Sequence, residues 1–421
     1  MDAIVCTLGA RLAASEFCEV RLFSLALNMT HSRIRRVLLT AAIAAAVGGH
    51  SVGQVEPPRR MTAFGSLPLT DFYTTKAPLT GKPGSLIRSE SFDGYDLPAG
   101  ASAIRILYES ASAAGDEVAS SGVVLLPDGT PPSQGWPVVA WAHPFIGTAR
   151  TCAPSLMTGL HSAPLLNMYL NLGYAVVATD YAGLGTDFRN AFIDMKSNAT
   201  DVIYAMQAAH QLKAPLGQRW VTVGEDDGGA AALAVAELED SLHDTGFLGS
   251  VAISGAFDLK TALDRMAQGP WQDSLAFLAY GIQTVYPKFR PADWMTSKGL
   301  ERYRVANQSC STTAAESRSP LKDMLKPSWQ SDPLVRDFVQ RNTLGLKPAR
   351  APLLIISTES ANPGDSMTAR VVGRMCGQGD RIDVKSYSAA DSSEVMGASM
   401  SGQVSWIKAR FAGQASENDC R

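Results

Sequence analysis

An α/β fold, with a mostly parallel sheet, helices on both faces and one inserted helical segment, is the architecture that this chain predicts. Between residues 137 and 254, short apolar runs alternate with helical stretches, a pattern typical of βαβ units. A tight glycine turn at residues 224–229 joins one of the strands to a helix of small residues. The alternation stops between residues 257 and 348 and then resumes, which indicates an insertion.

Length and charge exclude several functional classes. The chain has 421 residues, of which 46% are hydrophobic, so it is long enough to bury a substantial core. Its net charge of -3 provides no basic field for nucleic acid or for an anionic membrane surface. The glycines at 183 and 185 lack the lysine and the spacing of a phosphate-binding loop. We therefore expect no nucleic-acid partner and no cofactor.

The N-terminal region has the composition of an export signal. Arginines at positions 33, 35 and 36 precede the apolar run 37–47 (VLLTAAIAAAV), and small residues follow as far as residue 53. This run is too short to span a bilayer but fits a secretory signal peptide at about 29–53. Met29 precedes the basic residues, so we expect translation to start there. The alternative, a buried apolar helix, does not explain the arginines. We predict a secreted or periplasmic protein that is not integral to the membrane.

Four of the six cysteines lie beyond this signal, at positions 152, 310, 376 and 420. In an oxidising compartment they predict up to two disulfides, and their spacing leaves all three pairings open. No Cys-x-x-Cys motif is present, and we predict no metal site.

The first predicted elements are strands. Residues 54–98 are rich in Pro, Gly, Ser and Thr without periodicity, which predicts an irregular arm over the surface. Residues 103–109 and 118–126 predict an antiparallel pair, and residues 137–142 (PVVAWA) a buried strand.

Helices and strands then alternate. The expected elements follow in chain order: a helix at 165–172, a strand at 174–179, a helix at 199–212, a strand at 220–223, a helix from 228 and a strand at 249–254. Beyond the insertion we expect strands at 352–357 and 382–387, and a closing helix marked by Val404, Ile407 and Phe411.

The predicted organisation has six parts. They are 1–53, an N-terminal extension with the signal peptide; 54–98, the arm; 99–256, the first part of the core; 257–348, the helical insertion; 349–413, the second part of the core; and 414–421, a tail. Within the insertion, the aromatic stretch 277–289 (FLAYGIQTVYPKF) either lines a tunnel for an acyl chain or forms ordinary core, and both interpretations stay open.

The segment 220–239 (WVTVGEDDGGAAALAVAELE) organises the rest of the chain. A strand, a sharp turn and a helix in this order resemble a nucleophile elbow, in which Gly-x-Ser-x-Gly places a serine on a strained turn. Here the serine position holds Asp226. Gly224, Gly228 and Gly229 leave room where the strand and the helix cross.

These acids have two further interpretations. Carboxylates at the start of a helix cap free N–H groups and suit the positive end of the helix dipole, so Glu225, Asp226 and Asp227 serve stability alone in that reading. The same acids together with His143 offer hard ligands for a divalent cation. Because the cluster is so compact along the chain, solvated acids at a helix start are favoured over a metal site.

Several motifs in the same order resemble the secretory lipase family of α/β-hydrolases. They are residues 141–155 (WAHPFIGTARTCAPS), residues 173–186 (GYAVVATDYAGLGT), the elbow GEDDGG, the lid-sized insertion, and PLLIIS at 352–357 followed by the closing helix. The resemblance covers about residues 103–412. It implies the α/β-hydrolase fold, a helical lid, and ester hydrolysis by a serine, a histidine and an acid beside an oxyanion hole.

The residues expected in those roles are replaced. Asp226 cannot perform serine acyl transfer, although aspartate nucleophiles act in α/β-hydrolases that resemble haloalkane dehalogenases and epoxide hydrolases, with a histidine to activate water. The family's histidine would lie in residues 388–395 (SAADSSEV), where Asp391 or Ser392 is nearest. No histidine follows residue 243 in the sequence.

The acid and the oxyanion loop also depart from the family pattern. The acid would follow the strand 352–357, where Glu359 and Asp365 are the available carboxylates although the aligned position is Ala361 or Asn362. In the oxyanion loop a proline without an N–H donor replaces a glycine after His143. Phe145 and Asp227 are the expected ligand-binding residues beside the elbow. His143 either holds its loop by hydrogen bonds or serves as a relocated base.

These replacements predict a secreted pseudoenzyme that keeps an esterase scaffold and binds an apolar or acyl ligand, or a partner protein, in the inherited cleft. Catalytic groups act as a unit, so the loss of several leaves little activity. The alternative is an active ester or lipid hydrolase that uses Asp226 with a relocated base such as His143. A third hypothesis, a purely structural protein, predicts a filled pocket. The oligomeric state stays open.

Overall fold

The computed structural model of the chain describes residues 66–75, 78–79, 81–112, 114–242, 244–256, 258–268, 274–308, 310, 323–358, 366–388 and 392–420. The expected signal peptide at 29–53 lies outside the described residues, as do His243, Glu359, Asp365 and Asp391.

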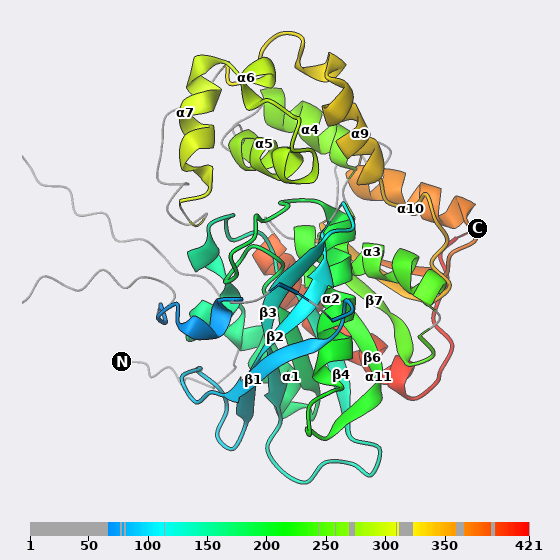
Figure 1. The fold of residues 1–421 in the computed structure, drawn as a ribbon. Coiled ribbons are helices and arrows are strands. Elements are labelled where there is room, and N and C mark those ends of the chain that lie inside the picture. The colour runs from blue at the N-terminus through cyan, green and yellow to red at the C-terminus, as the bar shows by residue number, and fades with distance from the viewer. Residues whose placement is uncertain are drawn as a thin grey trace, which may run out of the picture. The chain divides into compact units, whose positions relative to one another are not determined.

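The core is a nine-stranded sheet with the strand order β1-β2-β3-β5-β4-β6-β7-β8-β9 (Figure 1). The strands are β1 (Leu86–Ser91), β2 (Ser102–Ala111), β3 (Glu117–Leu126), β4 (Trp136–Ala142), β5 (Ala175–Thr179), β6 (Leu216–Glu225), β7 (Phe247–Ile253), β8 (Leu353–Thr358) and β9 (Ile382–Tyr387). From β1 to β5 neighbouring strands in the sheet are antiparallel, and from β5 to β9 they are parallel. The mostly parallel sheet predicted from the sequence is confirmed.

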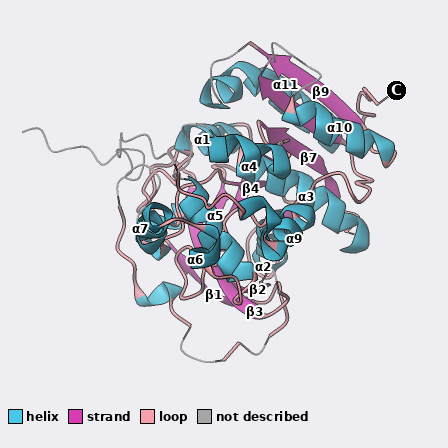
Figure 2. Cartoon of the chain, turned by 90° about the horizontal axis from the view of Figure 1, so that it is seen from above, coloured by secondary structure: helices cyan, strands magenta, loops and turns pink. Residues whose placement is uncertain are grey.

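Helices cover both faces of this sheet (Figure 2). They are α1 (Ala163–Asn171), α2 (Met195–Ala209), α3 (Asp227–Leu242), α10 (Met367–Gly377) and α11 (Ser392–Phe411). In β4, Val138 and Ala140 pack in the hydrophobic cluster that holds α2, α3 and α10. Val139 and Trp141 pack in the cluster that holds α1 and α11. Because successive strand residues face opposite sides, a strand buried on both faces is apolar throughout, as residues 137–142 are.

Several elements differ from their expected bounds, and three of these differences bear on the argument. Strand β1 lies inside the stretch predicted to be irregular, because its polar outer residues hide the alternation that marks a strand. Helix α2 begins at Met195, earlier than expected, since the buried Asp194 carboxylate caps it by accepting the N–H of Ser197 at 2.9 Å. Helix α11 begins at Ser392, so the position nearest to the family's histidine is the first turn of a helix.

The segment between β7 and β8 is mainly helical and lies beyond the carboxyl ends of the parallel strands (Figure 1). It contains α4 (Leu259–Gln268), α5 (Ser274–Val285), α6 (Pro291–Trp294), α7 (Ser297–Ala306), the short helix η4 (Trp329–Ser331) and α9 (Pro333–Arg341). These helices share their own hydrophobic cluster, which includes Phe277, Phe289 and Trp294. We refer to this segment as the lid.

The lid is tied to the core at separate places. Arg341, at the end of α9, forms an ion pair with the buried Asp194, with Nε 2.6 Å from Oδ2. Thr148 of the loop after β4 donates its hydroxyl to the carbonyl oxygen of Ala306 at 2.8 Å. The same loop is linked to the lid by the disulfide Cys152–Cys310. A second disulfide, Cys376–Cys420, joins α10 to the C-terminal segment, so one of the three pairings left open is now determined.

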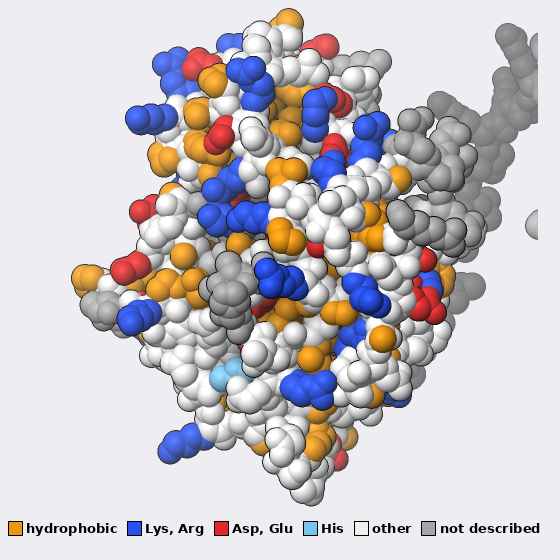
Figure 3. Space-filling view, turned by 90° about the vertical axis from the view of Figure 1, so that its right-hand side faces the viewer, with side chains coloured by type: hydrophobic (Ala, Val, Ile, Leu, Met, Phe, Trp, Pro, Cys, Tyr) orange, Lys and Arg blue, Asp and Glu red, His pale blue; other side chains and the backbone are white. Residues whose placement is uncertain are grey.

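In the face drawn in Figure 3, Lys and Arg side chains are interspersed with hydrophobic and acidic ones. Within the described parts of the chain, no helix combines the length and the apolar character needed to cross a bilayer.

We predict that replacing both Cys152 and Cys310 by serine destabilises the protein more than replacing both Cys376 and Cys420. A disulfide stabilises mainly by restricting the unfolded chain, and the bridged residues are 158 and 44 positions apart. Each double variant should lose a few kcal/mol of unfolding free energy. Because this loss depends on the logarithm of the loop length, the two losses should differ by about 1 kcal/mol.

Denaturant unfolding of the two double variants, each compared with the parent protein, measures this difference. Addition of reductant to the parent reproduces the sum of the two losses. A larger loss from the Cys376 and Cys420 pair would contradict the loop-entropy explanation.

Candidate functional site

Asp226 occupies the sharp turn between β6 and α3 with a positive φ of 49°. This region of backbone space disfavours residues with a Cβ, and its use at a strand end indicates a position held by its surroundings. The N–H of Asp226 donates to the carbonyl oxygen of Ile253 in the neighbouring β7 at 2.9 Å, and its own carbonyl accepts from Ala230 at 3.0 Å. The turn therefore has the backbone form of a nucleophile elbow with an aspartate at its apex.

The three glycines lie where neighbouring backbones approach most closely. A Cβ on Gly224 would lie 2.1 Å from the carbonyl oxygen of Gly228, and one on Gly228 would lie 2.2 Å from that of Ala142. A Cβ on Gly229 would lie 2.8 Å from the Cα of Gly255, which follows β7. Only glycine lets strand, helix and neighbouring loop approach to these distances.

Asp227, the residue after the apex, is buried, with 9% of its surface exposed. Its Oδ1 accepts the backbone N–H of Phe145 at 2.6 Å. Burial first, and then the adjacent Asp226 carboxylate, raise the pKa of Asp227 to about 8, although hydrogen bonds from the N–H groups of Phe145 and of Asp227 itself lower it. At neutral pH the Asp227 carboxyl group is therefore mainly protonated.

These two N–H groups are the donors that the elbow architecture uses for an oxyanion. In α/β-hydrolases the hole is made by the N–H of the residue after the nucleophile and by an N–H from the loop that corresponds to residues 143–147 here. In this protein both point to the carboxyl group of Asp227. The chain thus fills its own oxyanion position with a side chain.

His143 follows β4 and is buried, with 2% of its surface exposed. Its Nδ1 lies 2.7 Å from the carbonyl oxygen of Pro144, and its Nε2 lies 3.2 Å from that of Asp180. Burial lowers the pKa of His143 to about 4 despite these two contacts. Both ring nitrogens thus face backbone carbonyls of their own loop and of the segment after β5, and the proposed pairing of His143 with Asp226 remains a prediction.

Phe145 connects the oxyanion loop to the lid. Its ring centroid lies 4.1 Å from that of Phe192 and 5.0 Å from that of Phe277 in α5. Phe192 and Phe277 are both buried, so the beginning of the aromatic stretch 277–289 packs against the loop beside the elbow. Phe145 thus contacts both parts: its ring packs on Phe277 of the lid, and its backbone N–H donates to Asp227 at the elbow.

The other predicted positions are placed only in part. Glu359 and Asp365 lie outside the described residues, and their role as the acid stays a prediction. Among the described residues, no group of three or more His, Cys, Asp or Glu side chains is arranged to hold a metal ion.

A buried polar cluster around Asp180 was missed from the sequence. Asp180, directly after β5, accepts the hydroxyls of Ser121 and Ser155 and the N–H of Ser155. Arg105, with 3% of its surface exposed, donates to the hydroxyl of Tyr95 at 2.8 Å and to the carbonyl of Ser155 at 3.3 Å. The cluster joins β2, β3 and β5 to the loop that carries Cys152. Its only sequence signal is an aspartate at a strand end.

Ser254 was also missed, although it lies beside the elbow. It follows β7, has a positive φ of 54°, and its register places it next to Asp226, because Glu225 pairs with Ile253. Its hydroxyl is buried without a hydrogen-bond partner in the described part of the chain. The neighbouring parallel strands β6 and β7 are therefore each followed by a polar residue with a positive φ, Asp226 and Ser254. Only the sheet register shows that these two residues are neighbours.

We predict that Asp227→Asn stabilises the protein increasingly as the pH rises from about 4 to about 8. A carboxyl group whose pKa is raised on folding costs stability as the unfolded chain ionises and the native state does not, and asparagine has no such cost. Each unit of pKa difference corresponds to about 1.4 kcal/mol, so a gain of roughly 2 kcal/mol or more is expected at pH 8. The asparagine oxygen still accepts the N–H of Phe145.

Thermal unfolding of the parent and the variant between pH 4 and pH 8 measures this gain. Asp116→Asn, at an exposed turn, is the control for loss of a carboxylate. A constant difference between Asp227→Asn and the parent across this range would show that Asp227 ionises alike in both states and would refute the explanation.

Comparisons with known proteins agree with this fold. The family model described as "Secretory lipase" matches residues 153–419. Candida antarctica lipase A is similar in structure, with a TM-score of 0.70 and 18% sequence identity, over 85% of this chain and 89% of the other.

Two bacterial structures are similar as well. The rice cell wall degrading esterase LipA from Xanthomonas oryzae has a TM-score of 0.64 and 19% identity, over 79% of this chain and 98% of the other. A putative hydrolase from Legionella pneumophila has a TM-score of 0.65 and 18% identity, over 79% of this chain and all 100% of its own. No curated protein matches the sequence. At these identities the solved structures show the α/β-hydrolase fold alone, but the family model spans more than half of the chain, which therefore belongs to the secretory lipase family.

Proposed function

We propose that this protein is an exported, lipase-derived pseudoenzyme that binds an apolar or acyl ligand and does not hydrolyse esters through a serine nucleophile. The scaffold is that of a lipase-like hydrolase. The observation that carries the proposal is the carboxyl group of Asp227, which takes the N–H of Phe145 at 2.6 Å.

The oxyanion position is the first obstacle to catalysis. Removal of a single oxyanion-hole donor slows related reactions by about 10²–10³-fold, because the donors stabilise charge that develops only in the transition state. An ester carbonyl entering this site would have to displace the Asp227 carboxyl from both N–H groups. Above pH 8 the displaced group is also negatively charged, which opposes an oxyanion beside it.

The missing base is the second obstacle. A serine or an aspartate nucleophile needs a histidine to move a proton, and the sequence has no histidine after residue 243. His143 is the described histidine on the loop beside the elbow, and its pKa of about 4 makes it a poor proton acceptor at neutral pH. Its ring nitrogens also face the carbonyls of Pro144 and Asp180.

The alternative is hydrolysis by Asp226 with His143 as a relocated base. It is favoured by one observation, the positive φ of Asp226, because strained backbone clusters at working active sites. The contacts of His143 weigh against it.

Ligand binding is supported by what surrounds the elbow. Phe145, Phe192 and Phe277 bring apolar surface to the polar turn, an arrangement that suits a ligand with an apolar chain. The lid is tied down by the Arg341–Asp194 ion pair and by Cys152–Cys310, so a ligand would meet a preformed site.

An extracellular location is indicated by the secretory family and by the two disulfides. We propose that residues 29–53 provide the signal peptide that directs the export.

We predict that the purified protein cleaves p-nitrophenyl butyrate and p-nitrophenyl decanoate no faster than the buffer does, and that Asp226→Ala leaves this rate unchanged. The release of nitrophenolate over a pH series from 5 to 9 is the measurement. Asp116→Asn serves as the matched control for surface charge.

Turnover that Asp226→Ala abolishes would overturn the pseudoenzyme proposal. In that case His143→Gln identifies the base, because loss of the same rate in both variants is the result that the alternative mechanism requires.

A further inference from the structure

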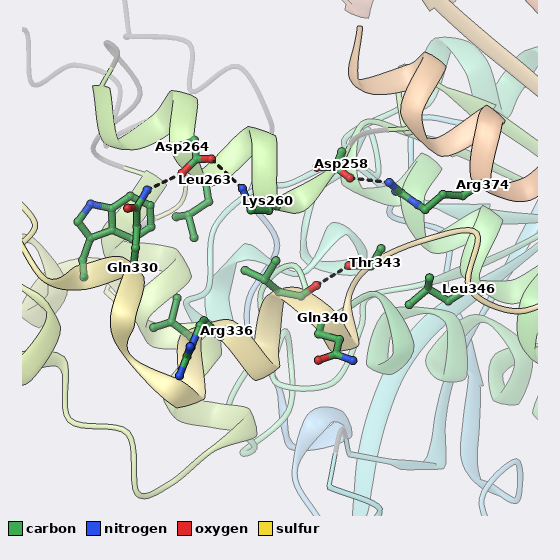
Figure 4. A pocket seen from close by; sticks show the side chains of 13 residues that line it. Asp258, Lys260, Leu263, Asp264, Gln330, Arg336, Gln340, Thr343, Leu346 and Arg374 are labelled. Carbon is green, nitrogen blue, oxygen red and sulfur yellow. Dashed lines mark hydrogen bonds and ion pairs between the residues drawn. The ribbon is translucent and has the colours of Figure 1, made fainter. Parts of the chain in front are cut away.

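A cavity of about 680 Å³ lies between the lid and α10, and none of its lining residues belongs to the elbow or to the oxyanion loop. Figure 4 shows Asp264 and Gln330 towards one end, Leu346 and Arg374 towards the other, and Arg336 on α9 along one side. Sites for small molecules typically have volumes of about 300–1,000 Å³ and are mainly apolar with a few polar groups. This cavity has the size of such a site.

The charges around the cavity leave one cation in excess. Asp258 is neutralised by Arg374, with Oδ2 2.8 Å from Nη1, and Asp264 faces Lys260 at 3.5 Å. The third cation of the lining is Arg336. Its exposed guanidinium group makes no hydrogen bond or ion pair with any described residue. A ligand with a single negative charge would therefore complete the charge balance.

The uncharged lining is mainly apolar. It consists of Leu263, Trp329, Val335, Val339 and Leu346, with Gln330, Gln340 and Thr343 as the polar members. Leu263 in α4 and Val335 in α9 are buried, with 3% and 2% of their surfaces exposed, and line the cavity together with the half-buried Val339. Leu346 lies at the rim with 52% of its surface exposed and is one of the few large apolar side chains of the described surface left this open to water. A hydrocarbon chain on these residues would remove water from Leu346.

We propose that this cavity binds an aliphatic monocarboxylate, with the carboxylate on Arg336 and the chain along Val335, Val339 and Leu346. The planar guanidinium group holds a carboxylate through two parallel hydrogen bonds. A single excess charge suits a monoanion better than a phosphate dianion. The inference goes beyond the proposed function, because it adds a second ligand site whose lining shares no residue with the elbow.

Calorimetric titration of the full-length exported protein with decanoate at pH 7 tests the proposal, with decan-1-ol as the uncharged ligand of equal length. Decanoate should bind about 10-fold or more tightly than decan-1-ol. In Arg336→Gln this preference should disappear, because hydrogen bonds to a charged group are lost and affinity for decanoate falls about 10- to 100-fold. Affinity for decan-1-ol should stay the same.

A second variant tests the apolar part of the cavity. Leu346→Asp should weaken both ligands about 10-fold or more, because it removes apolar contact and adds a like charge for the carboxylate. Both positions are exposed, so neither change threatens the fold, and the melting temperature of each variant verifies this. Arg304→Gln and Val305→Asp on α7, also exposed and outside the cavity lining, are the matched controls and should bind as the parent does.

Three results would overturn the inference: no binding of decanoate, unchanged decanoate affinity in Arg336→Gln, or unchanged affinity in Leu346→Asp. Loss of binding in Phe145→Ala, with the cavity variants unaffected, would place the ligand at the elbow and would leave the proposed function standing. Ester turnover dependent on Asp226 would instead refute the proposed function, while the titrations would still decide the cavity.

Discussion

The close crossing of β6 and α3 is the constraint on which the rest of the structure depends. A Cβ on Gly224 would lie 2.1 Å from the carbonyl oxygen of Gly228, and a Cβ on Gly228 would lie 2.2 Å from that of Ala142 in the neighbouring β4. This crossing holds the turn in a positive φ and presents Asp226 at the carboxyl edge of the sheet. The crossing constrains the backbone and not the side chain at the apex. The scaffold therefore persists whether that side chain is a hydroxyl or a carboxyl group.

The carboxyl groups at the turn change what the scaffold can do. Asp227 lies in the place from which an oxyanion would accept two N–H groups, and burial beside Asp226 raises its pKa to about 8. A serine hydrolase leaves these donors unoccupied so that they stabilise charge in the transition state. Here both N–H groups already interact with the carboxyl group of Asp227 in the folded protein. In the proposed function, the same hydrogen bonds therefore contribute to the fold and not to catalysis.

The lid links this altered elbow to an apolar environment. Phe145 packs on Phe192 and Phe277, while Arg341 and the disulfide Cys152–Cys310 fix the lid to the core at two distant points. A lid restrained in this way does not need to move in order to form a binding surface. Residues of this restrained segment, among them Val335, Arg336 and Val339 of α9, line the cavity beside α9.

The sequence alone determined the fold class, because alternating apolar runs, the glycine turn and the interrupted rhythm are local patterns that tertiary contacts do not override. It also showed that the elbow position holds Asp226 instead of a serine and that no histidine follows residue 243. Only the tertiary structure decided the disulfide pairing and the contact of Asp227 with Phe145. These depend on residues far apart in the chain, and no local periodicity records which backbone amide a buried carboxyl group will reach.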